Sequence, residues 1–174
     1  PAAREEILMA GKVIQIRVRR QDTPTSNPYW EEFEIPYRER QNVVSVMMEI
    51  EKNPVTRDGK KSSPVVFDRA CLEEVCGSCA MRINGVSRMA CTALIDSLEQ
   101  PIRLEPMAKF PVRRDLAVDR AVMFESLKRV HAWVPIDGTY DLGAGPRMAE
   151  AERQQAYEYS KCITCGNCLD VCPQ

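Results

Sequence analysis

The sequence contains one histidine, little net charge and no long apolar run. A membrane-spanning helix needs roughly 18–20 apolar residues, and the amino-terminal PAAREEILMAGK has too short an apolar stretch for a secretory signal. A net charge of −1 gives no reason to expect nucleic acid as a partner. The single histidine, His131, is expected to be structural. These absences predict a soluble, intracellular protein whose connection to any membrane is made through a partner.

All eight cysteines fall into two runs, and each run has the spacing of iron–sulfur cluster ligands. The first run reads C-x4-C-x2-C-x11-C, typical of plant-type [2Fe–2S] ligands. The second reads C-x2-C-x2-C-x3-C-P, the bacterial spacing for a cubane-type cluster. The first run consists of Cys71, Cys76, Cys79 and Cys91. The second run consists of Cys162, Cys165, Cys168 and Cys172. Two cluster motifs with no thiol left over predict electron transfer.

A hairpin is expected to return the distant fourth cysteine of the first run to the other three. Asn84-Gly85 is the strongest two-residue hairpin signal. The predicted register pairs Ile83 with Val86, Arg82 with Ser87, Met81 with Arg88 and Ala80 with Met89. Its continuation places Cys91 opposite Ser78, beside Cys79.

The second run lacks partners further along the sequence. In two-cluster ferredoxins its fourth cysteine ligates the other cluster, so Cys172 is expected to serve a third cluster, while Cys162, Cys165 and Cys168 wrap the second. No cysteine follows Cys172. Either the sequence is a fragment, or Cys172 closes the second cluster itself. We expect the fragment, because a helical domain that ends inside its ligand loop cannot complete its core.

A structural zinc site is the alternative for the first run. Zinc also takes four thiolates, usually in paired C-x2–4-C knuckles. Only Cys76 and Cys79 fit that form, and Cys71 is left unexplained. A zinc-stabilised interaction module without a redox role is therefore the less favoured interpretation.

The remaining sequence changes character near its middle. Alternation over 13–19 and 33–37 predicts two strands of an antiparallel hairpin, and short strands are expected at 65–67 and 102–104. Asn42 is expected to cap a helix that ends at Asn53-Pro54.

Beyond residue 107 the apolar positions recur at three and four. Asp115 is expected to cap one helix, and Pro146 to begin another that runs to about Lys161. The sequence thus predicts a strand-rich domain over 1–107 and a helical domain over 108–174.

Three segments resemble the iron–sulfur subunit of succinate dehydrogenase and fumarate reductase. They are PYWEEFEIPYR (28–38), SPVVFDRACLEEVCGSCAMRINGVSRMACTALI (63–95) and KCITCGNCLDVCP (161–173). The CGSC loop and the CITCGNC run are most similar to bacterial menaquinone-linked forms. The resemblance implies an α+β protein with a β-grasp plant-type ferredoxin domain followed by an all-α bacterial-type ferredoxin domain.

The same resemblance implies cofactors and partners. Cys71, Cys76, Cys79 and Cys91 would hold [2Fe–2S]; Cys162, Cys165 and Cys168 would hold [4Fe–4S]; Cys172 would belong to [3Fe–4S], whose other ligands lie outside this sequence. No residue is expected to be catalytic. The implied partners are an FAD-containing flavoprotein, a membrane-anchor cytochrome b subunit and a quinone, with menaquinone favoured. The implied location is the cytoplasmic side of the cell membrane, through these partners. A subunit of another flavin-dependent oxidoreductase, such as a thiol-dependent fumarate reductase, is the closest alternative.

Overall fold

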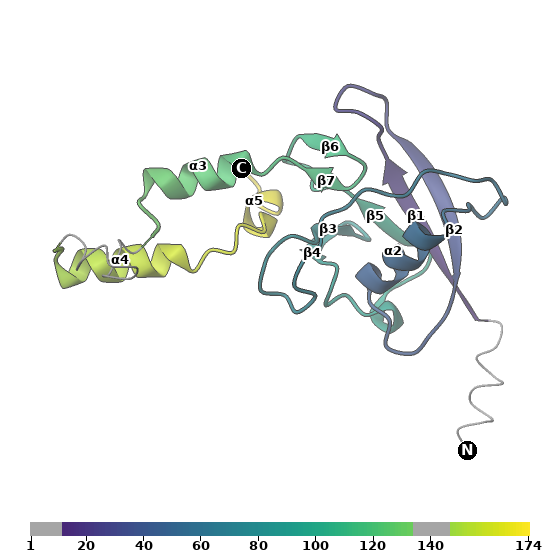
Figure 1. Cartoon of the computed structure of the whole chain (residues 1–174), viewed down its shortest axis with the longest axis horizontal. Helices are drawn as coiled ribbons and strands as arrows, with labels where there is room; N and C mark the ends of the chain where they lie inside the picture. Colours follow the sequence, from purple (N-terminus) through teal and green to yellow (C-terminus); the bar gives the residue numbers. More distant parts are fainter. Residues whose placement is uncertain (1–11, 134–146) are drawn as a thin grey trace, which may run out of the picture. The chain divides into compact units, whose positions relative to one another are not determined.

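The computed structural model describes residues 12–133 and 147–174, which form two compact units (Figure 1). One unit comprises the residues up to 119 together with 165–174, and the other comprises 120–164. The first unit contains β1 (Val13–Arg20), β2 (Tyr29–Pro36), α2 (Val43–Lys52), β3 (Ala80–Ile83), β4 (Val86–Met89), the 3-10 turn η1 (Ile95–Ser97), β5 (Ile102–Glu105), β6 (Val112–Arg114), β7 (Ala117–Val118) and α5 (Asn167–Asp170). The second contains α3 (Ala121–Arg129) and α4 (Glu150–Ser160).

A five-stranded mixed sheet organises the first unit, with strand order β2-β1-β5-β3-β4. The predicted hairpin of β1 and β2 is confirmed, with Val13 opposite Pro36 and Arg20 opposite Tyr29. β5 lies parallel to β1, and β3 pairs antiparallel with β5. The alternation in β1 turns Ile14, Ile16 and Val18 into the core, because successive side chains of a strand point to opposite faces.

Helix α2 contributes five residues to the core. Its amino terminus is a capping box, in which Asn42 Oδ1 accepts from Ser45 N at 2.9 Å and Asn42 N donates to Ser45 Oγ at 3.0 Å. The helix ends at Lys52, so the predicted cap and stop are confirmed. Its buried residues are Val43, Val44, Val46, Met47 and Ile50.

Two expected elements are wrong. Residues 65–67 form no strand, although Val65 and Phe67 are buried. Asp115 caps no helix: it lies buried in the turn between β6 and β7 with φ 48°, and α3 begins six residues later at Ala121. One hydrogen bond accounts for both errors: the amide of Val66 donates to the carboxylate of Asp115. The amide is then not paired with a strand, and the carboxylate does not cap a helix.

The helical region agrees with expectation in part. α4 ends at Ser160, close to the predicted Lys161, while Pro146 lies outside the described residues. Residues 108–119 and 165–174 belong to the first compact unit. The division into domains at 1–107 and 108–174 stays a prediction. No helix in the described ranges is long and apolar enough to cross a membrane.

Candidate metal centre

The loop between Cys71 and Cys79 turns its backbone amides toward sulfur. Leu72, Glu74 and Gly77 have φ angles of 63°, 62° and 74°. The left-handed conformation costs a non-glycine residue roughly 1–2 kcal/mol, so Leu72 and Glu74 hold it against their own preference. Left-handed residues among right-handed ones make a backbone concavity that binds anions, including iron–sulfur clusters. Here the amides of Glu73 and Ser78 donate to Cys71 Sγ and Cys76 Sγ, each at 3.4 Å.

The hairpin of β3 and β4 brings the fourth cysteine back, in the predicted register. Ile83 pairs with Val86 and Ala80 with Met89. One step further, Ala90 N donates to Cys79 O at 3.1 Å, so the antiparallel pairing continues to the cysteines. Cys79 and Cys91 are buried, whereas Cys71 and Cys76 are half-buried.

The four thiols of the first run interact with one another. After Ser78, Cys71 contributes most to lowering the pKa of Cys76, and after burial, Cys79 contributes most to raising the pKa of Cys91. Besides burial and Cys79, the backbone of Glu74 acts to lower the pKa of Cys91 and the charge of Cys71 acts to raise it, so both lie near this thiol. The hairpin and the loop therefore meet at the sulfurs. Among residues 12–133 and 147–174, no three His, Cys, Asp or Glu side chains are arranged around a single metal ion.

The thiols differ in acidity because their surroundings differ. The hydroxyl of Ser78 and then the amides of Cys71 and Ser78 lower the pKa of Cys76 to about 6. Burial raises the pKa of Cys91 to about 11, and its contact with Cys79 adds to the rise. Hydrogen bonds to the charged form and desolvation act here in opposite directions. Cys76 therefore favours the thiolate form, whereas the buried Cys91 disfavours it.

Most of the second run is fastened to the first unit. Gly166 has φ +83°, and a Cβ there would lie 2.7 Å from Cζ of Phe110. The carboxylate of Asp170 accepts from Lys109 N at 3.1 Å and bonds to Ser87 of β4. Cys165, Cys168 and Cys172 belong to this unit, whereas Cys162 follows α4 in the other unit.

Sequence reasoning missed a buried ion pair that contacts the segment leading to the first cysteine run. Arg20 and Asp115 are both 0% exposed, and Arg20 Nε donates to Asp115 Oδ1 at 2.9 Å. A signal was present: Arg20 continues the inward phase of Ile14, Ile16 and Val18, so the alternation puts a charge on the core face. A buried charge requires a partner.

Comparison with known proteins gives two domain matches. Residues 15–125 match the family described as a 2Fe-2S iron-sulfur cluster binding domain, and residues 156–174 match the 4Fe-4S binding domain. The first range contains all four cysteines of the first run, and the second contains all four of the second.

Two relatives identify the protein family more closely than the domain matches do. The succinate dehydrogenase iron-sulfur subunit of Bacillus subtilis is 65% identical over 93% of this chain and 64% of its own length. The fumarate reductase iron-sulfur subunit of Wolinella succinogenes is 30% identical over 93% of this chain and 67% of its own. The chain belongs to the family of succinate dehydrogenase and fumarate reductase iron–sulfur subunits. It spans a little under two thirds of the length of the Bacillus relative.

A solved structure extends the family likeness to the fold. A chain of the Mycobacterium smegmatis Sdh1 complex in the apo form superposes with a TM-score of 0.64. It is 23% identical, and the match covers 92% of this chain and 63% of that one. The family confirms the predicted [2Fe–2S] and [4Fe–4S] cofactors, and a [3Fe–4S] cluster is consistent with it.

The first site suits a [2Fe–2S] cluster. It brings four thiols near one another, and the cluster takes four thiolates. Backbone amides already aim at two of these sulfurs, and such hydrogen bonds stabilise negative charge at a cluster. Cys79 and Cys91 lie only 4% and 5% exposed, which keeps water from that side. The residues present therefore fit the group that the family implies.

Proposed function

We propose that this iron–sulfur subunit relays single electrons between a flavoprotein subunit and a membrane-bound quinone in a succinate:quinone oxidoreductase or fumarate reductase. The gathering of four thiols under inward-pointing amides carries the proposal. Iron–sulfur clusters supply one-electron redox chemistry when bound. The chain itself holds and tunes them, and no residue of it is assigned a role in making or breaking substrate bonds.

Each cysteine of the first run has a proposed place. Cys71 helps to lower the pKa of Cys76, and Cys79 helps to raise the pKa of Cys91, so the members of each pair lie near each other. A [2Fe–2S] cluster has two irons joined by two sulfides, which leaves two thiolates for each iron. We assign the pair Cys71 and Cys76 to one iron and the pair Cys79 and Cys91 to the other. The amides of Glu73 and Ser78 then stabilise negative charge on the first pair.

For the second run, Cys162, Cys165 and Cys168 are proposed ligands of [4Fe–4S], and Cys172 of [3Fe–4S]. The spacing and the match to the 4Fe-4S binding domain support this assignment.

The finer fold is proposed on the same basis. The mixed sheet with β1 parallel to β5 and α2 beside it is consistent with a β-grasp ferredoxin domain over 1–107. Helices α3, α4 and α5 are consistent with an all-α ferredoxin domain over 108–174, from which the short strands β6 and β7 at 112–118 depart.

The partners follow from the family. They are an FAD-containing flavoprotein, a cytochrome b anchor and a quinone, with menaquinone preferred, on the cytoplasmic side of the membrane. A thiol-dependent fumarate reductase is the alternative complex. The zinc module is disfavoured, because the matching domain family binds 2Fe-2S clusters over the very residues that zinc would use.

Succinate-driven reduction tests the proposed function. The native complex is purified without oxygen, mixed with succinate, and frozen for electron paramagnetic resonance. The expected result is a cluster signal that appears with succinate and disappears on adding a quinone. A complex whose clusters respond to another donor, and not to succinate or fumarate, would refute the assignment to this enzyme class.

A further inference from the structure

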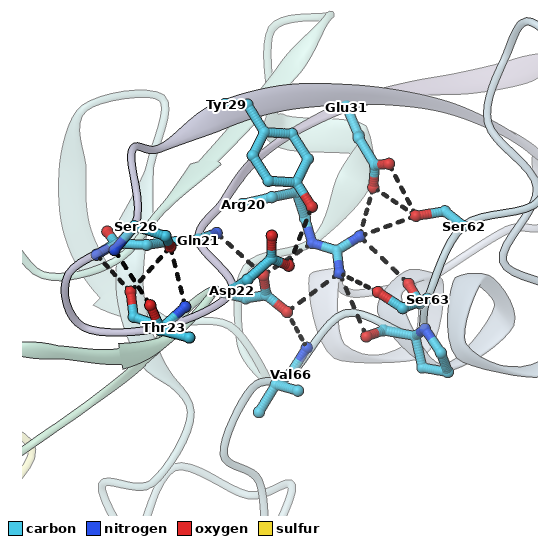
Figure 2. Close-up of polar contacts among 12 residues, drawn as sticks. Arg20, Gln21, Asp22, Thr23, Ser26, Tyr29, Glu31, Ser62, Ser63 and Val66 are labelled. Atoms are coloured by element: carbon cyan, nitrogen blue, oxygen red, sulfur yellow. Dashed lines mark hydrogen bonds and ion pairs between the residues drawn. The ribbon is translucent and has the colours of Figure 1, made fainter.

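The segment that leads into the first cysteine run is held by side chains instead of strand pairing. Residues 62–66 belong to no strand. Arg20 at the end of β1 donates to Ser63 O at 3.2 Å, Ser63 Oγ at 3.0 Å and Pro64 O at 3.4 Å, and it also reaches Ser62 Oγ at 3.3 Å (Figure 2). One guanidinium thus binds three consecutive residues of the segment.

Asp115 joins the same hydrogen-bond network through both of its carboxylate oxygens. Its Oδ2 accepts from Val66 N at 2.9 Å and from Arg20 Nη2 at 3.2 Å. Its Oδ1 accepts from Gln21 N at 3.1 Å, and Leu116 N donates to Val66 O at 3.1 Å. The carboxylate therefore joins the end of β1, the β6–β7 turn and the last residue of the segment.

A second arginine fixes the chain between this network and the first ligand. Arg69 forms a two-pronged ion pair with Glu51 of α2, with contacts of 2.8 and 3.4 Å. Its guanidinium also lies 4.8 Å from the ring centre of the buried Phe67. Anchors at Val66, Phe67 and Arg69 leave one residue before Cys71. The position of Cys71 is thus tied to the positions of these anchors.

The chemistry of the pair makes it a rigid support. The guanidinium is a planar fork whose donors have fixed directions, and here Arg20 Nε and both terminal nitrogens are engaged. Burial alone lowers the pKa of Arg20, but its hydrogen bond and attraction to Asp115, then Glu31, outweigh burial and raise it. Loss of one partner would leave a buried charge that the other was placed to compensate.

We propose that Arg20 and Asp115 are positioning residues for the first cluster, which hold segment 62–66 so that Cys71 stands ready beside Cys76 and Cys91. The inference rests on the proposed cluster site. Neither residue is placed in contact with the cluster; they act through the backbone that carries its first ligand.

Two substitutions in the full chain test this role. Asp115→Asn keeps the size of the side chain and removes its charge, and Arg20→Lys keeps the charge and removes the fork. Amide hydrogen exchange of the cluster-free protein should rise at least tenfold at residues 62–70 in Asp115→Asn. The reduced [2Fe–2S] resonance should change its g values or line width, and the cluster should be lost at least threefold faster. Arg20→Lys should show the same changes more weakly.

A matched core substitution separates positioning from general stability. Ile14→Ala removes buried carbon from the opposite end of the same strand. It should lower stability while the resonance and the exchange of 62–70 stay as in the natural sequence. Should Asp115→Asn fail to fold, Ser63→Ala removes one bond of 3.0 Å and should still quicken exchange at 62–66.

The outcomes are distinct. If Asp115→Asn lowers stability like Ile14→Ala but leaves the resonance and the exchange unchanged, the pair only supports the core and the inference is overturned. If the natural sequence itself holds no [2Fe–2S] cluster, the proposed cluster site and the inference both fail.

Discussion

Asn84 in the β3–β4 turn and Arg103 in β5 bond to each other in both directions. Asn84 N donates to Arg103 O at 2.9 Å, and Arg103 N donates to Asn84 Oδ1 at 2.7 Å. The amide of the Asn84 side chain also donates to Glu99 O at 2.8 Å. The turn that returns Cys91 to the other thiols is therefore fixed to β5, and a local sequence signal is reinforced by the sheet.

Replacing both turn residues should weaken the first cluster from a distance. Asn84 and Gly85 have φ angles of 51° and 82°, which a β-branched side chain resists. Asn84→Val with Gly85→Val should destabilise the chain by roughly 2–6 kcal/mol, at about 1–3 kcal/mol for each strained residue. The [2Fe–2S] signal per chain should fall in parallel. Val86→Thr, at an exposed neighbouring position, is the control and should leave the signal unchanged. A full signal in the double variant would remove the closing role assigned to the hairpin.

Removal of one buried ligand should be selective. Cys91→Ala should abolish the [2Fe–2S] resonance and spare the [4Fe–4S] resonance, because it deletes one of four thiolates at the first site only. Thr92→Ala changes the adjacent residue, whose hydroxyl makes one long contact of 3.5 Å, and should retain both signals. Survival of an unaltered [2Fe–2S] spectrum in Cys91→Ala would show that the ligand assignment is wrong.

Gly166 and Gly59 form a matched pair for the second cysteine run. Both have positive φ, but a Cβ at Gly59 meets nothing within 4 Å, whereas one at Gly166 meets Phe110 at 2.7 Å. Gly59→Ala should cost about 1–2 kcal/mol from backbone strain alone. Gly166→Ala should cost clearly more and reduce the [4Fe–4S] content, because Phe110 must move. Urea unfolding and iron analysis of both variants measure this. Equal effects of the two substitutions would mean that the packing of Gly166 against Phe110 does not matter for stability or for the [4Fe–4S] content.

In the cluster-free protein, the thiols of Cys76 and Cys91 should titrate at widely separated pH values. Cys76, with a pKa of about 6, should be alkylated readily at pH 7.5, and Cys91, with a pKa of about 11, at least tenfold more slowly. Because the pKa of Cys76 is lower in the folded protein than the roughly 8.5 of an unfolded chain, Cys76 should increase the free energy of unfolding above about pH 8.5. This contribution should disappear as the pH falls through about 6. The raised value of Cys91 acts oppositely, so its contribution is present below about 8.5 and lost as pH rises through 11. Pulsed alkylation with mass spectrometry at several pH values would contradict this account if both thiols reacted alike.

Local signals allowed correct prediction of much of the structure. The Asn84-Gly85 register and the Asn42 cap depend on residues within a few positions of one another, and both are as expected. The two cysteine spacings likewise pointed to the cluster types that the family matches confirm.

Long-range partners explain the errors. Asp115 looks like a helix cap because a helical pattern follows it, yet its carboxylate is taken by Arg20, which lies 95 positions away in the sequence. The amide of Val66 bonds to Asp115 and not to a neighbouring strand, so an apolar run that resembles a strand forms none. The left-handed conformation of Leu72 and Glu74 could not be predicted from these residue types, because the loop around the thiols imposes it.

Metal and sulfide analysis, joined to electron paramagnetic resonance on protein purified without oxygen, tests most directly whether the cysteines of this chain hold redox-active clusters. If the cysteines hold these clusters, the protein should contain iron with acid-labile sulfide and give a rhombic [2Fe–2S] signal after reduction, and this signal should be absent from Cys91→Ala. Colourless protein without iron, or protein with zinc in its place, would contradict the assignment of clusters to these cysteines.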